Sequence, residues 1–132
     1  MSKKINVLLF SVILFIAVFL RLSQISSLPP SLNWDEVSIG YNAYSVLKTG
    51  KDEWGQFLPL SFRAFGDYKL PTYVYLTTLW PLNPRITSIV AGTLTMLVSY
   101  LLARKLFNKQ IALVTLLLAA MSPWTVKLSR LA

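Results

Sequence analysis

Residues 5–22 read INVLLFSVILFIAVFLRL, an apolar run with only three polar interruptions. At 1.5 Å per residue, this run would be about 27 Å long as an α-helix, close to the thickness of the hydrocarbon core of a bilayer. It therefore predicts a first membrane-spanning helix. A cleaved signal peptide is the competing interpretation, because a basic start and the small residues Ser23, Ser26 and Ser27 fit that pattern too. Later apolar segments favour a retained anchor, and a mature N-terminus near Ser27 would overturn it.

Two further apolar runs follow towards the C-terminus. Residues 86–103 carry no charge and contain small or hydroxylated residues that let membrane helices approach closely: Ser88, Gly92, Thr93 and Ser99. A short basic turn leads to a third run over about 110–126, which Pro123 interrupts near its end. These two runs predict a helical hairpin. The expected fold class is an all-α integral membrane protein with about three transmembrane helices and a long outer loop carrying interfacial helices.

Composition supports a membrane class and excludes several kinds of chemistry. The chain has 132 residues, of which 55% are hydrophobic and 14% are charged, and its formal net charge is +8. The basic residues are scattered in ones and twos, so they indicate topology and contact with membrane lipids rather than nucleic-acid binding. Because the chain has no cysteine and no histidine, acid–base chemistry must use Asp, Glu, Lys or Tyr.

The distribution of charge predicts the topology. By the positive-inside rule, the short basic flanks lie in the cytoplasm and the loop over 23–85 lies outside the plasma (cytoplasmic) membrane of a multi-pass protein. These flanks contain Lys3, Lys4, Arg104, Lys105 and Lys109. The loop has five bases of its own, so the bias is carried by the flanks alone. It also holds all five acids of the chain: Asp35, Glu36, Asp52, Glu53 and Asp67.

Two helices are expected within this loop. Asn33 with Glu36 three residues later forms a capping-box pattern, which predicts a helix over about 34–48 that stops near Thr49-Gly50. Its apolar face would carry Val37, Tyr41, Tyr44 and Leu47, as in a helix lying on a membrane surface or against the spans. Residues 57–66 suggest an irregular aromatic turn. An uncharged aromatic stretch then predicts a second interfacial helix over about 71–80.

The adjacent carboxylates Asp35 and Glu36 are the candidate catalytic residues. Helix geometry points neighbouring side chains about 100° apart, so the two cannot share one task. Glu36 occupies the capping position, which leaves Asp35 as the residue that faces a cleft. Acids in a first helical turn are also favoured by the helix dipole without any chemistry, and this structural interpretation is about as well supported by the spacing.

The other polar residues of the loop allow alternatives. Lys69 either extends to lipid headgroups or contacts a phosphate. Trp34 fits an aromatic belt at the membrane interface, with sugar stacking as the alternative. Residues 52–54 suggest a solvated turn. The five carboxylates offer oxygen ligands, but no compact spacing requires a divalent metal, so no cofactor is required and metal use stays open.

Several strings together resemble the start of membrane glycosyltransferases of the GT-C superfamily, of the protein O-mannosyltransferase and aminoarabinose transferase type. They are PPSLNWDE at 29–36, GYNAYS at 40–45, FGDYKLP at 65–71, MSPW at 121–124 and LSR at 128–130. The resemblance implies a first transmembrane helix, an outer loop opening with Asp-Glu, two interfacial helices and many further spans. It covers essentially the whole chain, so residues 1–132 are expected to form the N-terminal part of one polytopic membrane domain.

The resemblance also implies an activity. It is an inverting transfer from a polyprenyl-phosphate sugar donor to a lipid, glycan or protein acceptor on the outer face. Asp35 would match the acid that deprotonates the acceptor hydroxyl, with Glu36 as its neighbour in the motif. Lys69 would meet the donor phosphate, with Asp67, Tyr68 and Trp34 as substrate-binding neighbours. In the family a Lys-Pro-Pro element is common, whereas here Leu70 separates Lys69 from Pro71.

The length of the chain raises an alternative. Related enzymes have many more spans, so this sequence is expected to be a fragment that is inactive by itself. The alternative is a small non-catalytic membrane protein or subunit whose outer loop binds a partner and whose Asp35-Glu36 pair only caps a helix. An open reading frame continuing past Ala132 would favour the enzyme.

Overall fold

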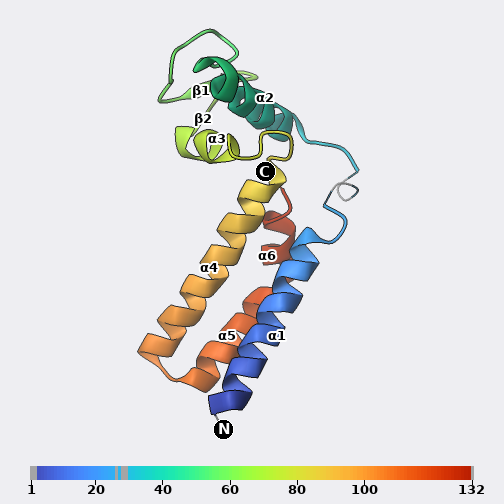
Figure 1. The fold of residues 1–132 in the computed structure, drawn as a ribbon, viewed down its shortest axis with the longest axis vertical. Coiled ribbons are helices and arrows are strands. Elements are labelled where there is room, and N and C mark those ends of the chain that lie inside the picture. Colours follow the sequence, from blue (N-terminus) through green and yellow to red (C-terminus); the bar gives the residue numbers. More distant parts are fainter. Residues whose placement is uncertain (1–2, 26, 28–29, 132) are drawn as a thin grey trace. The chain divides into compact units, whose positions relative to one another are not determined.

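The computed structural model describes residues 3–25, 27 and 30–131, so Ser26 and Pro29 of the sequence patterns above lie outside the described residues. The chain is mostly helical and divides into two compact units. A helical unit is formed by residues 1–25 and 89–130, and a loop unit by residues 26–88 with the last two residues. Figure 1 shows the elements of each unit.

The helical unit is built on α1 (Lys3–Leu22), α4 (Arg85–Leu106), α5 (Lys109–Met121) and α6 (Pro123–Leu128). The first turn of α4, up to Ser88, belongs to the loop unit. α1 and α5 pack side by side along their lengths (Figure 1). Their core is a cluster of small and aliphatic side chains from α1, α4 and α5: Ile13, Ala17, Met96, Leu113, Leu116 and Ala120.

Two helices of this unit, α1 and α4, are long and apolar enough to cross a membrane. They cover the predicted spans 5–22 and 86–103. The third predicted span, about 110–126, is not one helix: α5 has 13 residues and ends at Met121, and α6 begins at Pro123. Pro123 has no N–H and therefore cannot continue the hydrogen-bond ladder of α5.

At the break between α5 and α6, a side chain from α1 supplies hydrogen-bond donors to the carbonyl groups at the end of α5. Arg21 is fully buried, and its guanidinium donates to the carbonyls of Ala119 and Ala120 at 3.3 and 3.5 Å and to Thr125 Oγ1 at 3.5 Å. A helix end leaves carbonyls without intrahelical partners, and a guanidinium offers five donors in a fixed fork. Nothing in the sequence around Arg21 predicts this role.

The loop unit contains α2 (Trp34–Thr49), the strands β1 (Phe62–Ala64) and β2 (Asp67–Lys69), and α3 (Pro71–Thr77). Its core joins α2 to β1 and α3 through Ile39, Ala43, Val46, Phe62 and Val74. Full burial of a side chain as large as Phe62, which is 1% exposed, stabilises a fold by about 1.5–3 kcal/mol. This small core holds the hairpin against α2.

α2 covers the predicted helix, and its apolar stripe lies outside the core of the loop unit. The capping box of Asn33 and Glu36 is present, and Gly50 ends the helix in the left-handed conformation at φ 72°. The predicted apolar stripe is exposed, with values from 46% to 58% for Val37, Tyr41, Tyr44 and Leu47, so this face is available to a membrane surface. The neighbouring face, which carries Glu36, Ile39 and Ala43, is buried instead. On this face, the aliphatic side chains of Ile39 and Val46 pack in the core together with the small residue Ala43.

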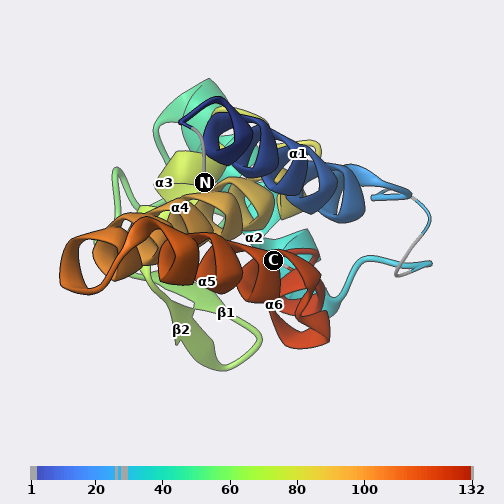
Figure 2. The same cartoon turned by 90° about the horizontal axis from the view of Figure 1, so that it is seen from below.

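The sequence also missed a β-hairpin, so the loop unit is not purely helical. β1 and β2 pair antiparallel with Ala64 opposite Asp67, which leaves Phe65 and Gly66 as a two-residue turn (Figure 2). Both turn residues have positive φ, 48° and 86°. This is the pattern of a type I′ hairpin turn, in which the first position usually prefers Asn, Asp or Gly. Because Phe65 occupies the first turn position, the sequence gives no indication of this type of turn.

Candidate active site

The hairpin turns Lys69 towards α2. Along β1 the side chains alternate, with Phe62 and Ala64 buried and Arg63 exposed. Phe62 pairs with Lys69 and Ala64 with Asp67, and directly paired residues project on the same side of a two-stranded sheet. Lys69 and Asp67 therefore share the side on which β1 contacts the core. The period of two in the strand brings these two charges together.

Asp35, Lys69 and Asp67 form one charged cluster. Lys69 Nζ lies 2.9 Å from Asp35 Oδ1 and 3.1 Å from Asp67 Oδ2. The Lys69 side chain is 22% exposed, and that of Asp35 is 49% exposed. Asp35 is therefore open to a ligand while its position is fixed by the ammonium. The sequence predicts that Asp35 faces a cleft; in the structure its side chain is half-exposed beside Lys69.

The cluster shifts the pKa of two of its members. The pKa of Lys69 is raised, first by its hydrogen bond to Asp35 and next by that to Asp67. The pKa of Asp67 is lowered, first by the backbone N–H of Tyr68 and then by Lys69. Both shifts favour the charged forms, because each group gains partners of opposite charge or hydrogen-bond donors. Lys69 is therefore a cation and Asp67 an anion at neutral pH.

Glu36 lies in a different environment. It is 1% exposed, and its carboxylate accepts hydrogen bonds from Arg85 Nε at 2.9 Å and from the Asn33 backbone N–H at 2.8 Å. The guanidinium of Arg85 also donates to Glu36 Oε2 at 3.0 Å and to the Ser31 carbonyl at 2.8 Å. The geometry thus gives Glu36 a structural task, which is to join the start of α2 to the start of α4.

A polar network between α3 and the first turn of α4 holds Arg85 in place. Tyr73 Oη lies 2.7 Å from Ser88 Oγ, and Thr77 Oγ1 lies 2.8 Å from Thr87 Oγ1. Trp80 Nε1 donates to the same Thr87 hydroxyl at 2.8 Å. Sequence analysis missed Arg85 because a base before an apolar run is typical of a helix end at the membrane interface. Its ion pair depends on a fold that no local pattern reveals.

The two predicted aromatic site residues do not join the cluster. Trp34 is 73% exposed and contacts the ring of Phe65 edge-on, with ring centroids 5.5 Å apart. The side chain of Tyr68 projects from the opposite side of the hairpin to that of Lys69, and it is exposed. Trp34 thus stands next to the hairpin turn, where it can offer a flat apolar surface, while Tyr68 faces away from Asp35.

The predicted solvated turn is present at Glu53 and Trp54, which are exposed, whereas Asp52 is buried. Asp52 is 5% exposed, and its Oδ1 accepts from the backbone N–H groups of Trp54 and Gln56. Glu53 is tied to α2 by two hydrogen bonds with Asn42. These acids organise the loop. In the part of the chain that the structure describes, no three acidic side chains gather closely enough to hold a metal ion.

Residues 70–132 match the sequence model of the family described as dolichyl-phosphate-mannose-protein mannosyltransferase. The match confirms the GT-C resemblance over these residues. It begins directly after Lys69, so Asp35 and Lys69 lie outside it. No curated protein and no solved structure matches the chain.

Proposed function

We propose that this chain supplies the catalytic base of an inverting glycosyltransferase, which transfers a sugar from a polyprenyl-phosphate donor to an acceptor hydroxyl on the outer face of the membrane. The observation that carries the proposal is the ion pair between Asp35 and Lys69, which places a half-exposed carboxylate beside a fixed cation. The family match supports the class of donor, because the name of that family specifies a dolichyl-phosphate sugar.

The proposed reaction is a single displacement at the anomeric carbon. The acceptor oxygen attacks this carbon, the bond from the carbon to the phosphate oxygen breaks, and the polyprenyl phosphate leaves with the electron pair. Asp35 takes the proton of the acceptor hydroxyl as the new bond forms. No acid need protonate the leaving group, since a phosphate departs readily as an anion. This differs from the two carboxylates that hydrolases require.

Lys69 is suited to hold both partners of the reaction. An ammonium group has three N–H donors, and the bonds to Asp35 and Asp67 use two of them. The third can donate to a phosphate oxygen of the donor, and the positive charge offsets the charge that grows on the departing phosphate. Asp35 meanwhile binds Lys69 through Oδ1, which leaves Oδ2 to accept the hydroxyl proton.

The test is the substitution Asp35→Asn, introduced into the chromosomal gene so that the cell expresses the variant in place of the wild-type protein. Sugar transfer from the lipid donor should be lost, while the amount of protein in the membrane stays unchanged. Asp67→Asn is the matched control, because it also removes an acid that pairs with Lys69 but should leave most of the transfer. Wild-type transfer by the Asp35 variant, or an equal loss in both variants, would contradict the assignment of the base.

A non-catalytic role for the loop unit has one observation in its favour. The apolar stripe of α2, from Val37 to Leu47, is exposed rather than packed in the core. Such a stripe suits a protein partner or a membrane surface. If Asp35→Asn leaves transfer intact while Tyr41→Ser and Tyr44→Ser release a bound subunit, the second function replaces the first.

A further inference from the structure

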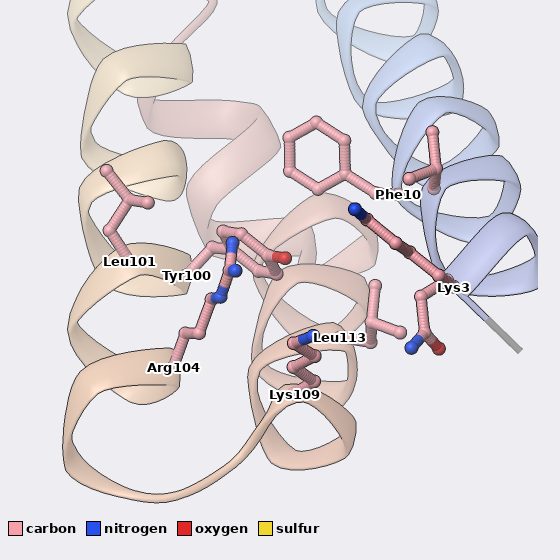
Figure 3. A pocket seen from close by; sticks show the side chains of 9 residues that line it. Lys3, Phe10, Tyr100, Leu101, Arg104, Lys109 and Leu113 are labelled. Carbon is pink, nitrogen blue, oxygen red and sulfur yellow. The ribbon is translucent and has the colours of Figure 1, made fainter. Parts of the chain in front are cut away.

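A second candidate site lies in the helical unit, at the end of α1 that carries Lys3. There a pocket of about 320 Å³ opens between α1, α4 and α5. Three basic side chains surround it, one from each helix: Lys3, Arg104 and Lys109 (Figure 3). The wall between them contains the aromatic pair of Phe10 and Tyr100, whose ring centroids are 4.9 Å apart.

The helical unit contains no acidic residue that could balance the charges around this pocket. The sequence has no Asp or Glu before Asp35 and none after Asp67, so the helical unit contains none. Three cations around one hollow repel one another, and a bound anion relieves that repulsion. The amide of Asn6 also lines the pocket, and its Oδ1 is buried without a hydrogen-bond partner among the described residues. An unsatisfied buried acceptor of this kind calls for a donor.

The surroundings of the pocket are apolar and open to the outside of the unit. Val7 and Leu101 line it and are 59% and 58% exposed, while Leu113 closes its inner side at 7% exposure. The pocket lies between α1 and α4, the two helices that are long and apolar enough to cross a membrane. A ligand that fits both features has an anionic head and a long apolar tail.

We propose that this pocket binds the headgroup of an anionic glycerophospholipid with a free hydroxyl, such as phosphatidylglycerol. The phosphate lies among Lys3, Arg104 and Lys109, a headgroup hydroxyl donates to Asn6 Oδ1, and an acyl chain follows the exposed side chains of Val7 and Leu101. Basic pockets between membrane helices commonly bind anionic headgroups on the cytoplasmic side. The expected topology puts these three bases on that side.

Arg104→Gln and Lys105→Gln form a matched pair for the test. Both remove one charge from the end of α4, and both side chains are exposed, but only Arg104 lines the pocket. Each full-length protein is reconstituted in phosphatidylcholine vesicles containing a minor fraction of phosphatidylglycerol and extracted in mild detergent. Native mass spectrometry then measures how much phosphatidylglycerol stays bound. Arg104→Gln should reduce the retained lipid about fivefold, while Lys105→Gln retains it, since one basic contact with an anionic lipid is worth about 1 kcal/mol.

Two further arms decide the nature of the ligand. Phosphatidylcholine vesicles alone should give no bound lipid, and excess inorganic phosphate in the wild-type sample should not displace phosphatidylglycerol. Displacement by phosphate would overturn the lipid assignment in favour of a site for a soluble anion. Equal losses in Arg104→Gln and Lys105→Gln would overturn the pocket itself, because lipid would then follow only the total charge of the helix ends.

Discussion

Glu36 and Arg85 form an ion pair, with 2.9 Å between Oε1 and Nε, although they are 49 residues apart in the sequence. Their side chains are 1% and 3% exposed. Asp35, the preceding residue, has a side chain that is 49% exposed and binds Lys69 instead. Because neighbouring residues of a helix point about 100° apart, one carboxylate fixes the loop unit from inside and the other faces outwards.

Replacing one partner of the buried pair should destabilise the loop unit strongly. In Glu36→Gln, the guanidinium of Arg85 would stay buried without a counter-charge, which typically costs about 3–5 kcal/mol. The free energy of unfolding of the detergent-solubilised chain measures this loss. Glu53→Gln is the control, because Glu53 contacts the uncharged Asn42 and should lose about 1 kcal/mol. A similar small loss in Glu36→Gln would show that the pair is not structural.

Lys69 should affect use of the donor more than folding. Lys69→Ala removes the cation proposed to meet the phosphate, so the KM for the lipid donor should rise by about tenfold or more, equivalent to about 1.4 kcal/mol of lost binding. Initial rates over a series of donor concentrations measure this change. Lys48→Ala, which removes a base from the exposed end of α2, should leave the KM unchanged. An unchanged KM in Lys69→Ala would favour simple contact with lipid headgroups.

The sequence predicts the parts of the fold that depend on local patterns. Asn33 and Glu36 reveal the start of α2, Gly50 its end, and the apolar runs the long helices α1 and α4. In each case the signal lies within one turn or within one continuous run. Local patterns also assign different tasks to Asp35 and Glu36. The spacing of three residues from Asn33 is enough to place Glu36 at the capping position.

The features of the fold and of the candidate site that the sequence does not predict depend on contacts between distant segments of the chain. Lys69 reaches Asp35 only because a hairpin with Phe65 in a left-handed turn position reverses the chain. Arg85 and Arg21 look like bases at helix ends, yet both side chains are buried among partners from other helices. No alternation or spacing within a window of ten residues carries that information, so these positions need the three-dimensional structure.

The ion pair of Asp67 and Lys69 should persist over a wide range of pH. The pKa of Asp67 lies below its ordinary 3.8, so its contribution is present above pH 3.8 and is lost as the pH falls through the lowered value. The pKa of Lys69 lies above its ordinary 10.5, so its contribution is present below pH 10.5 and is lost as the pH rises through the raised value. The ion pair of Asp67 and Lys69 therefore contributes its full stability above pH 3.8 and below pH 10.5.

Hydrogen exchange of the Tyr68 amide, which donates to Asp67 Oδ1 at 2.7 Å, reports on this cluster. After correction for the intrinsic exchange rate, protection should be constant from about pH 4 to pH 10 and fall below that range. In Asp67→Asn the acid transition should disappear. A loss of protection near neutral pH in the wild-type chain would mean that another group controls the hairpin.

Gly92 should be intolerant of even one added methyl group. A Cβ at this position would lie 2.6 Å from Ser129 Cβ, closer than such atoms approach in folded proteins. Overpacking of this kind typically costs about 1–3 kcal/mol, which exceeds the gain of up to about 1 kcal/mol in helix propensity from Gly to Ala. Gly92→Ala should therefore lower the free energy of unfolding of the detergent-solubilised chain. Ser129→Gly should restore part of it in the double variant, because it removes the atom that is struck, whereas a clash with any other group would leave the double variant no more stable than the sum of the single losses.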